Sequence, residues 1–295
     1  MIKSNPSLLK YIVWYFMGMG VLCTVLLVYV YNFHHNTSRV GSKQVLLEVY
    51  FPALLLPWIF LARRRLWHIL GISTMLVLVF ASMKRGPLIA VGAATIAYYA
   101  VRLLVYPRAW KANLLLPLVL ALGGLLVFAT MDTFRGGYFA SRLASVGEDE
   151  GSGRIEVYQE TIKMITKSTI SKIILGHGNN SVVEDSVLGL SAHNDWLETT
   201  YDFGFVGLLI YIGIHILMIG RLWHLVRAKS SLAPAFAAGY TMFLIVSSIS
   251  HLVIYPWYFI FLTSFFGAVT GLTEIPWPAV RMQSVRRPIL QTLRA

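Results

Sequence analysis

The fold is indicated most clearly by the stretch at 204–221, which reads GFVGLLIYIGIHILMIGR. Before its terminal arginine it contains no acidic or basic side chain except one histidine. About 20 mostly apolar residues in a helix suffice to cross a bilayer, and comparable runs recur along the chain. The eight expected spans lie at approximately 11–31, 45–62, 66–82, 87–106, 112–130, 204–221, 233–252 and 254–272.

The composition of the whole chain supports a membrane protein. Of its 295 residues, 57% are hydrophobic and only 13% are charged, and the mean hydropathy is +0.66. A soluble globular domain has about 25% charged residues, so most of this chain does not face water. The single cysteine, Cys23, lies in an apolar run, and one cysteine cannot form an internal disulfide or a cysteine-based metal site.

The charged residues divide the chain into two kinds of segment. Residues 131–203 hold every acidic residue except Glu48 and Glu274, whereas most basic residues stand in short loops between the apolar runs. Basic short loops are typical of the cytoplasmic side of a membrane. We therefore expect both termini in the cytoplasm and the acidic loop on the periplasmic side. No basic stripe with stacking aromatic residues is visible, which argues against a nucleic-acid partner.

These features predict an all-α fold, namely a polytopic membrane helix bundle of about eight spans with one large periplasmic loop that carries short helices. The expected parts are an N-terminal membrane bundle of five spans at 1–130, a periplasmic catalytic loop at 131–203, a C-terminal membrane bundle of three spans at 204–272 and a basic cytoplasmic tail at 273–295.

Two helices are expected within the loop. Apolar residues recur at helical spacing from Ile155 to Ile165, which predicts an amphipathic helix on the membrane surface or packed on the bundle. A second helix is expected to start near His193 and to run directly into the sixth span. Asp195 and Glu198 have the spacing of a capping box at its beginning.

The outer side carries the residues with the clearest chemical potential. Arg85 lies between two spans, Arg154 opens the amphipathic helix, and His193 and Asn194 precede the second helix. A guanidinium can bond two phosphate oxygens, a helix N-terminus favours anions, and an imidazole can take a proton from a hydroxyl. The set would suit transfer from a phosphate-linked donor. The plainer interpretations are an exposed loop charge for Arg85, a solvated Arg154 and a helix cap for Asn194.

Ionisable groups are nearly absent from the spans themselves. Ion-coupled transporters usually carry such groups at mid-membrane depth. His215 is the one obvious candidate, and a lone histidine in a span is more often packed against a neighbour. The pattern therefore disfavours a transporter.

Four stretches of the loop and the following span resemble the signature of the O-antigen ligase and polymerase superfamily. They are 154–158 (RIEVY), 176–178 (GHG), 192–198 (AHNDWLE) and 202–209 (DFGFVGLL). In addition, residues 82–87 (SMKRGP) are similar to the family's outer-side Ser-Arg-Gly motif, with Lys84 where serine is usual. The resemblance covers about 80–272 in layout and is sharpest in 154–209.

The resemblance implies an enzyme, a glycosyltransferase of the bacterial inner membrane that needs no cofactor and no metal. It would move a glycan from undecaprenyl diphosphate to a hydroxyl of lipid A–core at the periplasmic face. By the same resemblance, His193 would position or deprotonate the acceptor hydroxyl, and Arg85 and Arg154 would bind the diphosphate. Arg142 is an alternative to Arg85, and Asn194 is a further candidate for substrate binding.

The resemblance leaves other functions open. An O-antigen or exopolysaccharide polymerase, or a protein O-oligosaccharyltransferase, would use the same chemistry on another acceptor. Family members usually have more spans before the Ser-Arg-Gly motif, so the chain is expected to lack an N-terminal part. A non-catalytic, shortened homologue that acts as a membrane partner is therefore a third interpretation.

Overall fold

The computed structural model describes residues 49–62, 65–82, 84–134, 154–253 and 256–273, together with the isolated Gly18 and Gly137. Within these ranges every regular element is a helix, which confirms the all-α fold class. The first expected span, at 11–31, and the expected tail beyond Thr273 lie outside the described residues.

The expected span at 45–62 contains two short helices instead of one long helix. They are α2 (Tyr50–Ala53) and α3 (Leu56–Ile59), separated by a tight turn. Pro52 and Pro57 carry no backbone N–H, so neither can continue the hydrogen-bond pattern of a long helix. Both segments are nevertheless buried, and the indole of Trp58 donates to the carbonyl oxygen of Phe261 at 3.0 Å.

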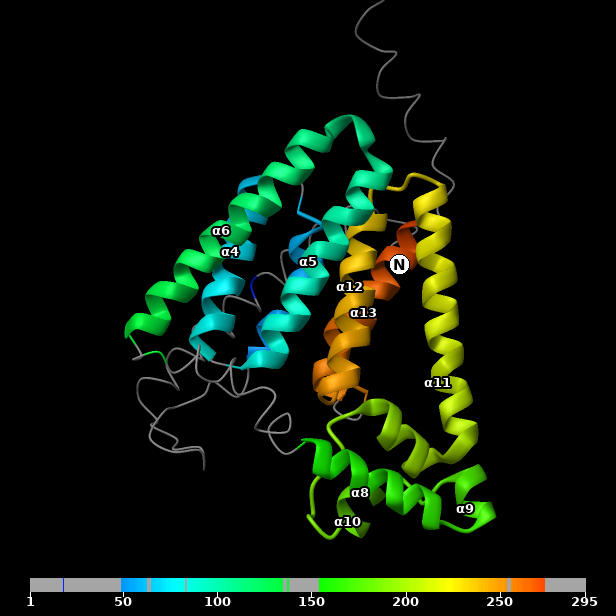
Figure 1. The fold of residues 1–295 in the computed structure, drawn as a ribbon. Coiled ribbons are helices and arrows are strands. Elements are labelled where there is room, and N and C mark those ends of the chain that lie inside the picture. The colour runs from blue at the N-terminus through cyan, green and yellow to red at the C-terminus, as the bar shows by residue number, and fades with distance from the viewer. Residues whose placement is uncertain are drawn as a thin grey trace, which may run out of the picture.

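The next helices lie close to where the apolar runs predict them (Figure 1). Each begins or ends within a few residues of the expected boundary, as capping and fraying allow. They are α4 (Arg65–Ser82), α5 (Arg85–Val105), the 3-10 turn η2 (Pro107–Ala109), α6 (Trp110–Phe134), α12 (Ala233–Ile249) and α13 (Pro256–Thr273).

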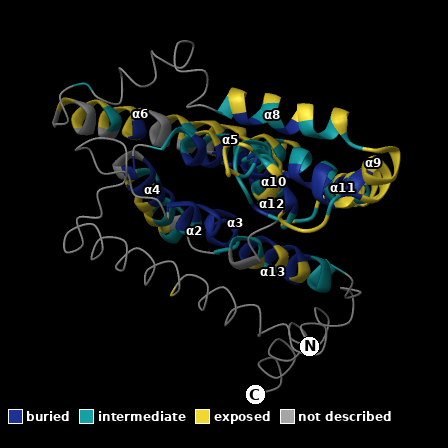
Figure 2. Cartoon of the chain, turned by 90° about the horizontal axis from the view of Figure 1, so that it is seen from below, coloured by how far each residue is buried: buried dark blue, intermediate teal, exposed yellow. Residues whose placement is uncertain are grey.

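The packing of α12 along α5 forms the centre of the bundle. These two helices make the most extensive contact between any two described elements, and α12 is largely buried, whereas α5 also carries exposed residues (Figure 2). Gly86, Ala90 and Ala94 recur every four residues on the buried side of α5. Small side chains at this spacing let helix backbones approach closely. Gly86 lies near Ile249, so the start of α5 meets the end of α12.

The helix α11 (Asp195–Arg227) begins where the sequence predicts but does not run straight. At Gly204 the backbone has φ 66° and ψ −165°, a region essentially restricted to glycine. The ring centroids of Trp196 and His215 lie only 4.7 Å apart, whereas a straight helix would separate these residues by about 28 Å. The expectation that this helix runs directly into the sixth span is therefore wrong, because a first segment (195–203) folds back on a second segment (205–227).

The reversal of α11 explains the surroundings of His215. Its ring stacks between Trp196 and Phe243, at centroid distances of 4.7 and 4.8 Å. Its Nδ1 lies 3.2 Å from the Tyr240 hydroxyl. This histidine is packed against neighbours, as expected for a lone histidine in an apolar helix.

The segment 154–190, which we call the loop subdomain, gathers at the end of the bundle where α11 begins (Figure 1). The predicted amphipathic helix is present, but it buries Val157 and Thr161 and leaves Ile155 and Ile162 exposed. Val182 of this subdomain forms a small core with Ala192 and Tyr201 of the chain that follows it. The helices of this subdomain are α8 (Arg154–Lys167), α9 (Ile170–Leu175) and α10 (Ser181–Asp185).

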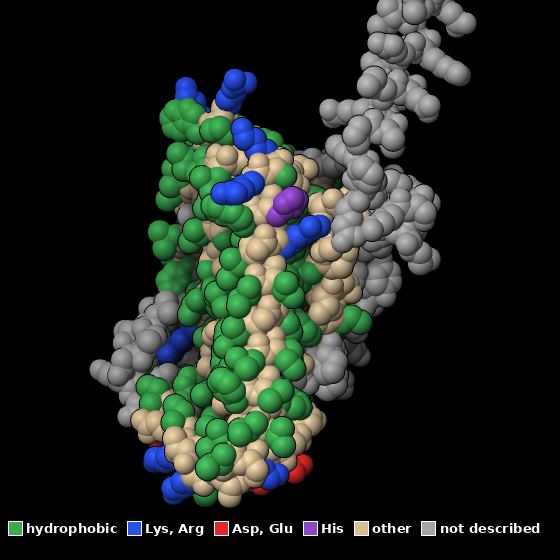
Figure 3. Space-filling view, turned by 90° about the vertical axis from the view of Figure 1, so that its right-hand side faces the viewer, with side chains coloured by type: hydrophobic (Ala, Val, Ile, Leu, Met, Phe, Trp, Pro, Cys, Tyr) green, Lys and Arg blue, Asp and Glu red, His purple; other side chains and the backbone are tan. Residues whose placement is uncertain are grey.

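Two described helices, α5 and α11, are long and apolar enough to cross a membrane. Shorter apolar helices cover Tyr50–Ile59, Leu66–Val79, Ala233–Ile249 and Tyr258–Thr273. Figure 3 shows hydrophobic side chains along the length of α11, with Lys and Arg gathered toward the two ends of the molecule. Exposed apolar surface bounded by charged ends is typical of a helix in contact with lipid.

Candidate active site

Four basic side chains from distant parts of the chain lie close together, and we call them the basic cluster. They are Lys84, Arg154, His193 and His251. They come from the start of α5, the start of α8, the N-terminus of α11 and the connection between α12 and α13. The two tyrosines Tyr50 and Tyr158 border the cluster.

The position of His193 is fixed by its own backbone and by the helix that follows. Its φ of 51° is left-handed, which turns the chain immediately before α11. Asn194 then caps the helix, because its Oδ1 accepts hydrogen bonds from the backbone N–H groups of Trp196 and Leu197 at 2.9 and 3.2 Å. Its Nδ2 also donates to the carbonyl oxygen of Ser248 at 3.1 Å. The plainer interpretation of Asn194 as a helix cap is confirmed.

The expected capping box is displaced by one residue. Asn194 occupies the cap position that the spacing assigned to Asp195. Glu198 therefore does not close the box, and one of its oxygens accepts from the backbone N–H of Ala192 at 2.7 Å. Asp195 instead accepts from the backbone N–H groups of Leu252 and Val253. The carboxylates join the start of α11 to the chain that follows α12.

The surroundings of His193 favour its neutral form. Burial is the largest cause, followed by the nearby His251, Arg154 and Lys84, and together they lower the pKa of His193 from 6.5 to about 4. At neutral pH the imidazole is therefore unprotonated and has a lone pair that can accept a proton.

Arg154 lies between the two tyrosines. It is within hydrogen-bonding reach of the Tyr50 hydroxyl and acts electrostatically on Tyr158. The Tyr158 hydroxyl lies 3.4 Å from the carbonyl oxygens of both His193 and Ser248. Burial raises the pKa of Tyr158, so its hydroxyl stays protonated and can donate. Arg154 and His193 are thus brought into one site, and Tyr158 links them.

The basic residue that reaches the cluster from the 82–87 motif is Lys84. Its Nζ lies 5.6 Å from the ring centroid of Tyr50, and its charge is among those that act on His193. Arg85 is the first residue of α5, is partly buried and is not among the charges that act on His193. Gly86 allows Tyr50 to lie against the start of α5, because a Cβ at residue 86 would collide with the Tyr50 hydroxyl. Arg142 lies outside the described residues.

Sequence reasoning emphasised Arg85 and overlooked Lys84, His251 and the two tyrosines. The substitution of lysine for the motif's usual serine was the available signal for Lys84. His251 offered a weaker one, because it is a polar residue at the end of the expected span 233–252. Nothing local in the sequence links Tyr50 to a site more than 100 residues away.

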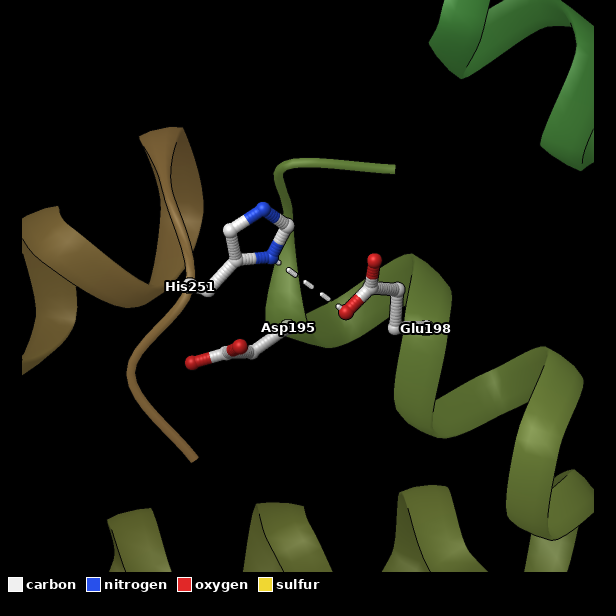
Figure 4. Close-up of side chains that lie close together, drawn as sticks. All are labelled: Asp195, Glu198 and His251. Atoms are coloured by element: carbon white, nitrogen blue, oxygen red, sulfur yellow. Dashed lines mark ion pairs between the residues drawn. The ribbon is translucent and has the colours of Figure 1, made fainter. Parts of the chain in front are cut away.

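Asp195, Glu198 and His251 form a buried group whose ligand-type atoms lie within 4.8 Å of one another (Figure 4). The ring of His251 faces Glu198, with Nδ1 3.5 Å from Oε2, whereas the Asp195 carboxylate points toward the backbone of 252–253. Backbone donors therefore occupy both Asp195 oxygens and one Glu198 oxygen. The group is better suited to bracing the chain than to surrounding a metal ion.

The GHG stretch serves as a support for α11 and is not part of the basic cluster. The backbone N–H groups of His177 and Gly178 donate to the carbonyl oxygens of Tyr201 and Asp202 at 3.1 and 2.9 Å. The His177 ring stacks on Tyr201 at 4.0 Å. Gly176 and Gly204 touch each other's neighbouring backbone so closely that neither position has room for a Cβ.

Comparison with protein families identifies one region. Residues 70–212 match a family model described as O-antigen ligase. The matched region includes Lys84, Arg85, Arg154 and His193, and it ends before His251. A comparison with curated proteins found no match.

Proposed function

We propose that this chain, whose residues 70–212 match the O-antigen ligase family model as its motifs suggested, is an O-antigen ligase-type glycosyltransferase. It moves a glycan from undecaprenyl diphosphate to a hydroxyl of lipid A–core. The observation that carries this proposal is the neutral imidazole of His193 beside the cations Lys84 and Arg154.

The two kinds of group have complementary roles in the transfer. The acceptor hydroxyl oxygen attacks the sugar carbon that carries the diphosphate. The bond between that carbon and the diphosphate oxygen breaks, and its electron pair leaves with undecaprenyl diphosphate. The hydroxyl proton passes to a ring nitrogen of His193. Lys84 and Arg154 stabilise the negative charge of the leaving group, a contribution that often exceeds that of the base.

The low pKa of His193 makes it a weak base in the empty site. A bound diphosphate carries negative charge, which opposes the effect of Lys84 and Arg154 and raises that pKa. Donor binding therefore strengthens the base at the moment when it is needed. Arg85 and Arg142 are further candidates for contacts with the diphosphate, and Asn194 holds the chain on which His193 stands.

We further propose that the site faces the periplasm of a bacterial inner membrane, within a multi-pass bundle of about eight spans. Lys84 precedes α5, and Arg108 follows it at a distance of about 30 Å along the helix, which is the thickness of the hydrocarbon core. Basic residues in short loops favour the cytoplasm, which supports cytoplasmic termini and a periplasmic basic cluster. The basic residues at or just beyond the far ends of these helices include Arg108, Lys111, Arg227 and Lys229.

Replacement of the central residues tests the proposal. His193→Ala and Arg154→Ala should insert normally but abolish transfer, because one removes the proton acceptor and the other a phosphate-binding cation. Gel analysis of lipopolysaccharide in a ligase-deficient strain measures the transfer. His224→Ala and Arg108→Ala are matched controls, since both residues are exposed at the other end of the helices.

Restoration of lipopolysaccharide banding by His193→Ala or Arg154→Ala would refute these roles. A parent protein that changes polymer length without attaching polymer to lipid A–core would indicate a polymerase. A purified parent that binds the lipid-linked donor but never releases undecaprenyl diphosphate would indicate a non-catalytic partner.

A further inference from the structure

His251 reaches the basic cluster from outside the matched family region. It lies in the connection between α12 and α13, and its ring meets that of His193 at a centroid distance of 4.3 Å and an interplanar angle of 39°. Its side chain is only 9% exposed. The contact is therefore a buried one between two imidazoles that are far apart in the sequence.

Both nitrogens of the His251 ring have polar neighbours. Nε2 lies 2.7 Å from the Ser191 hydroxyl, and Nδ1 lies 3.5 Å from Oε2 of Glu198. The other oxygen of Glu198 accepts from the backbone N–H of Ala192 at 2.7 Å, so the carboxylate is itself anchored. The ring of His251 is thus held at both edges by the chain that carries His193.

The backbone around His251 is held by the same segment. Asp195 accepts hydrogen bonds from the N–H groups of Leu252 at 3.1 and 3.2 Å and of Val253 at 3.1 Å. Residues 191–198 therefore fix both the side chain of His251 and the chain that follows it. An apolar residue at 251 could fill the space, but it could not make the two edge contacts.

We infer that His251, held between Glu198 and Ser191, is a positioning residue that fixes the imidazole of His193 by face contact in the proposed transfer site. This inference rests on the proposed function for the step that His193 performs. A proton acceptor displaced by about 1 Å can cost on the order of 100-fold in rate, so a fixed ring has a direct effect on turnover.

Titratable and charged groups face His193 and His251 from each element that packs against them. His193 faces Arg154 of α8, Lys84 before α5, and His251. His251 in turn faces Glu198 and Asp195 of α11. After burial, His251 is the largest cause that lowers the pKa of His193, so its removal should raise that pKa above about 4.

Kinetics of the purified full-length protein test the positioning role. His251→Gln should lower kcat by up to about 100-fold with little change in KM for the lipid-linked donor, because the diphosphate contacts remain. Ser191→Ala and Glu198→Gln should lower kcat less, since each removes one of the two edge contacts. His224→Gln is the matched control and should leave kcat and KM unchanged.

A second measurement does not require glycan transfer. Diethyl pyrocarbonate reacts with neutral imidazole, and mass spectrometry of the peptide that contains His193 gives its rate of modification. In the parent this rate should be nearly constant between about pH 5 and pH 8, because His193 stays neutral. In His251→Gln it should fall toward pH 5, whereas His224→Gln should behave like the parent.

These measurements distinguish failure of the inference from failure of the proposed function. Suppose that the parent transfers no glycan, but that the pH profile of His193 modification differs between the parent and His251→Gln. This result would overturn the proposed function and would still support the contact between the rings. Normal transfer and an unchanged profile in a folded His251→Gln would overturn the positioning role. If His251→Gln does not fold, Ser191→Ala decides, and an unchanged kcat in that variant also overturns it.

Discussion

Replacement of Gly204 by alanine offers the sharpest test of how the site is positioned. At this residue α11 reverses, with φ 66° and ψ −165°. An alanine Cβ would collide with the carbonyl of Ile174 and the backbone N of Gly176. Both atoms belong to the backbone, so the neighbours cannot relieve the collision by changing a rotamer.

The magnitude follows from these two effects. A non-glycine residue in this region of backbone space costs about 1–3 kcal/mol, and the collision with Ile174 adds to that cost. The free energy of unfolding should therefore fall by at least about 1–3 kcal/mol. The shift of the thermal midpoint per kcal/mol falls with chain length, so each kcal/mol should lower the midpoint of this 295-residue chain by about 2 °C.

Thermal unfolding of the purified protein, followed by tryptophan fluorescence, measures the change. Gly213→Ala is the matched control, because Gly213 lies in the second segment of α11 with open space around its Cβ position. Alanine there should raise helix stability by about 0.5–1 kcal/mol, so the two variants should shift the midpoint in opposite directions. A Gly204→Ala variant that unfolds at or above the parent midpoint would refute the reasoning about the reversal.

Four further predictions concern pH, charge and the loop. The acid limb of kcat/KM reports the enzyme without substrate and should lie well below pH 6.5, because the pKa of His193 is about 4. The acid limb of kcat should lie at higher pH, because bound diphosphate raises that pKa. A limb near pH 6.5 in both profiles would contradict this. The same shift should reduce stability as pH falls from about 6.5 to about 4, since the unfolded chain binds a proton on this residue before the folded protein does, and His193→Gln should lose that component of the pH dependence. Lys84→Met should raise KM for the donor roughly tenfold, about 1.5 kcal/mol for a charged contact, whereas Lys84→Arg should change it little; equal values in donor titrations would remove Lys84 from the site. Asp202→Ala should lower the unfolding free energy by about 2 kcal/mol or more in thermal melts, because the backbone N–H groups of Asn180 and Val182 lose their acceptor. Asp185→Ala removes only the one hydrogen bond that the Tyr201 hydroxyl donates and should cost less.

Helix positions followed from the sequence because apolar run length is a local property. The helices α4, α5, α12 and α13 begin and end near the expected boundaries for this reason. The break between α2 and α3 was missed, because proline in an apolar run is compatible with either a kinked helix or two short ones. The reversal at Gly204 was also missed. Several glycines occur in α11, and only the docking of Ile174 and Gly176 selects this one.

The candidate site was predictable only where a motif carried it. His193 and Arg154 came from stretches that resemble a family signature, and the structure brings them together. The choice between Lys84 and Arg85 depends on the residue at which α5 starts, because neighbouring residues at a helix start point in different directions. His251 lies 58 residues beyond His193, and the contact between their rings depends on how α12 ends against α11.

The close packing of α5 on α12 limits which amino-acid substitutions this chain can accept during evolution. Gly86, Ala90 and Ala94 leave little room for larger side chains along a line that begins beside the site and leads away from it. One or two methyl groups added at Ala94 would push α5 and α12 apart. The change in the angle between the helices would displace Lys84 at the start of α5 and Ser248 near the end of α12. Such positions never meet a substrate, yet the range of residues they tolerate should be as narrow as that of the groups that do.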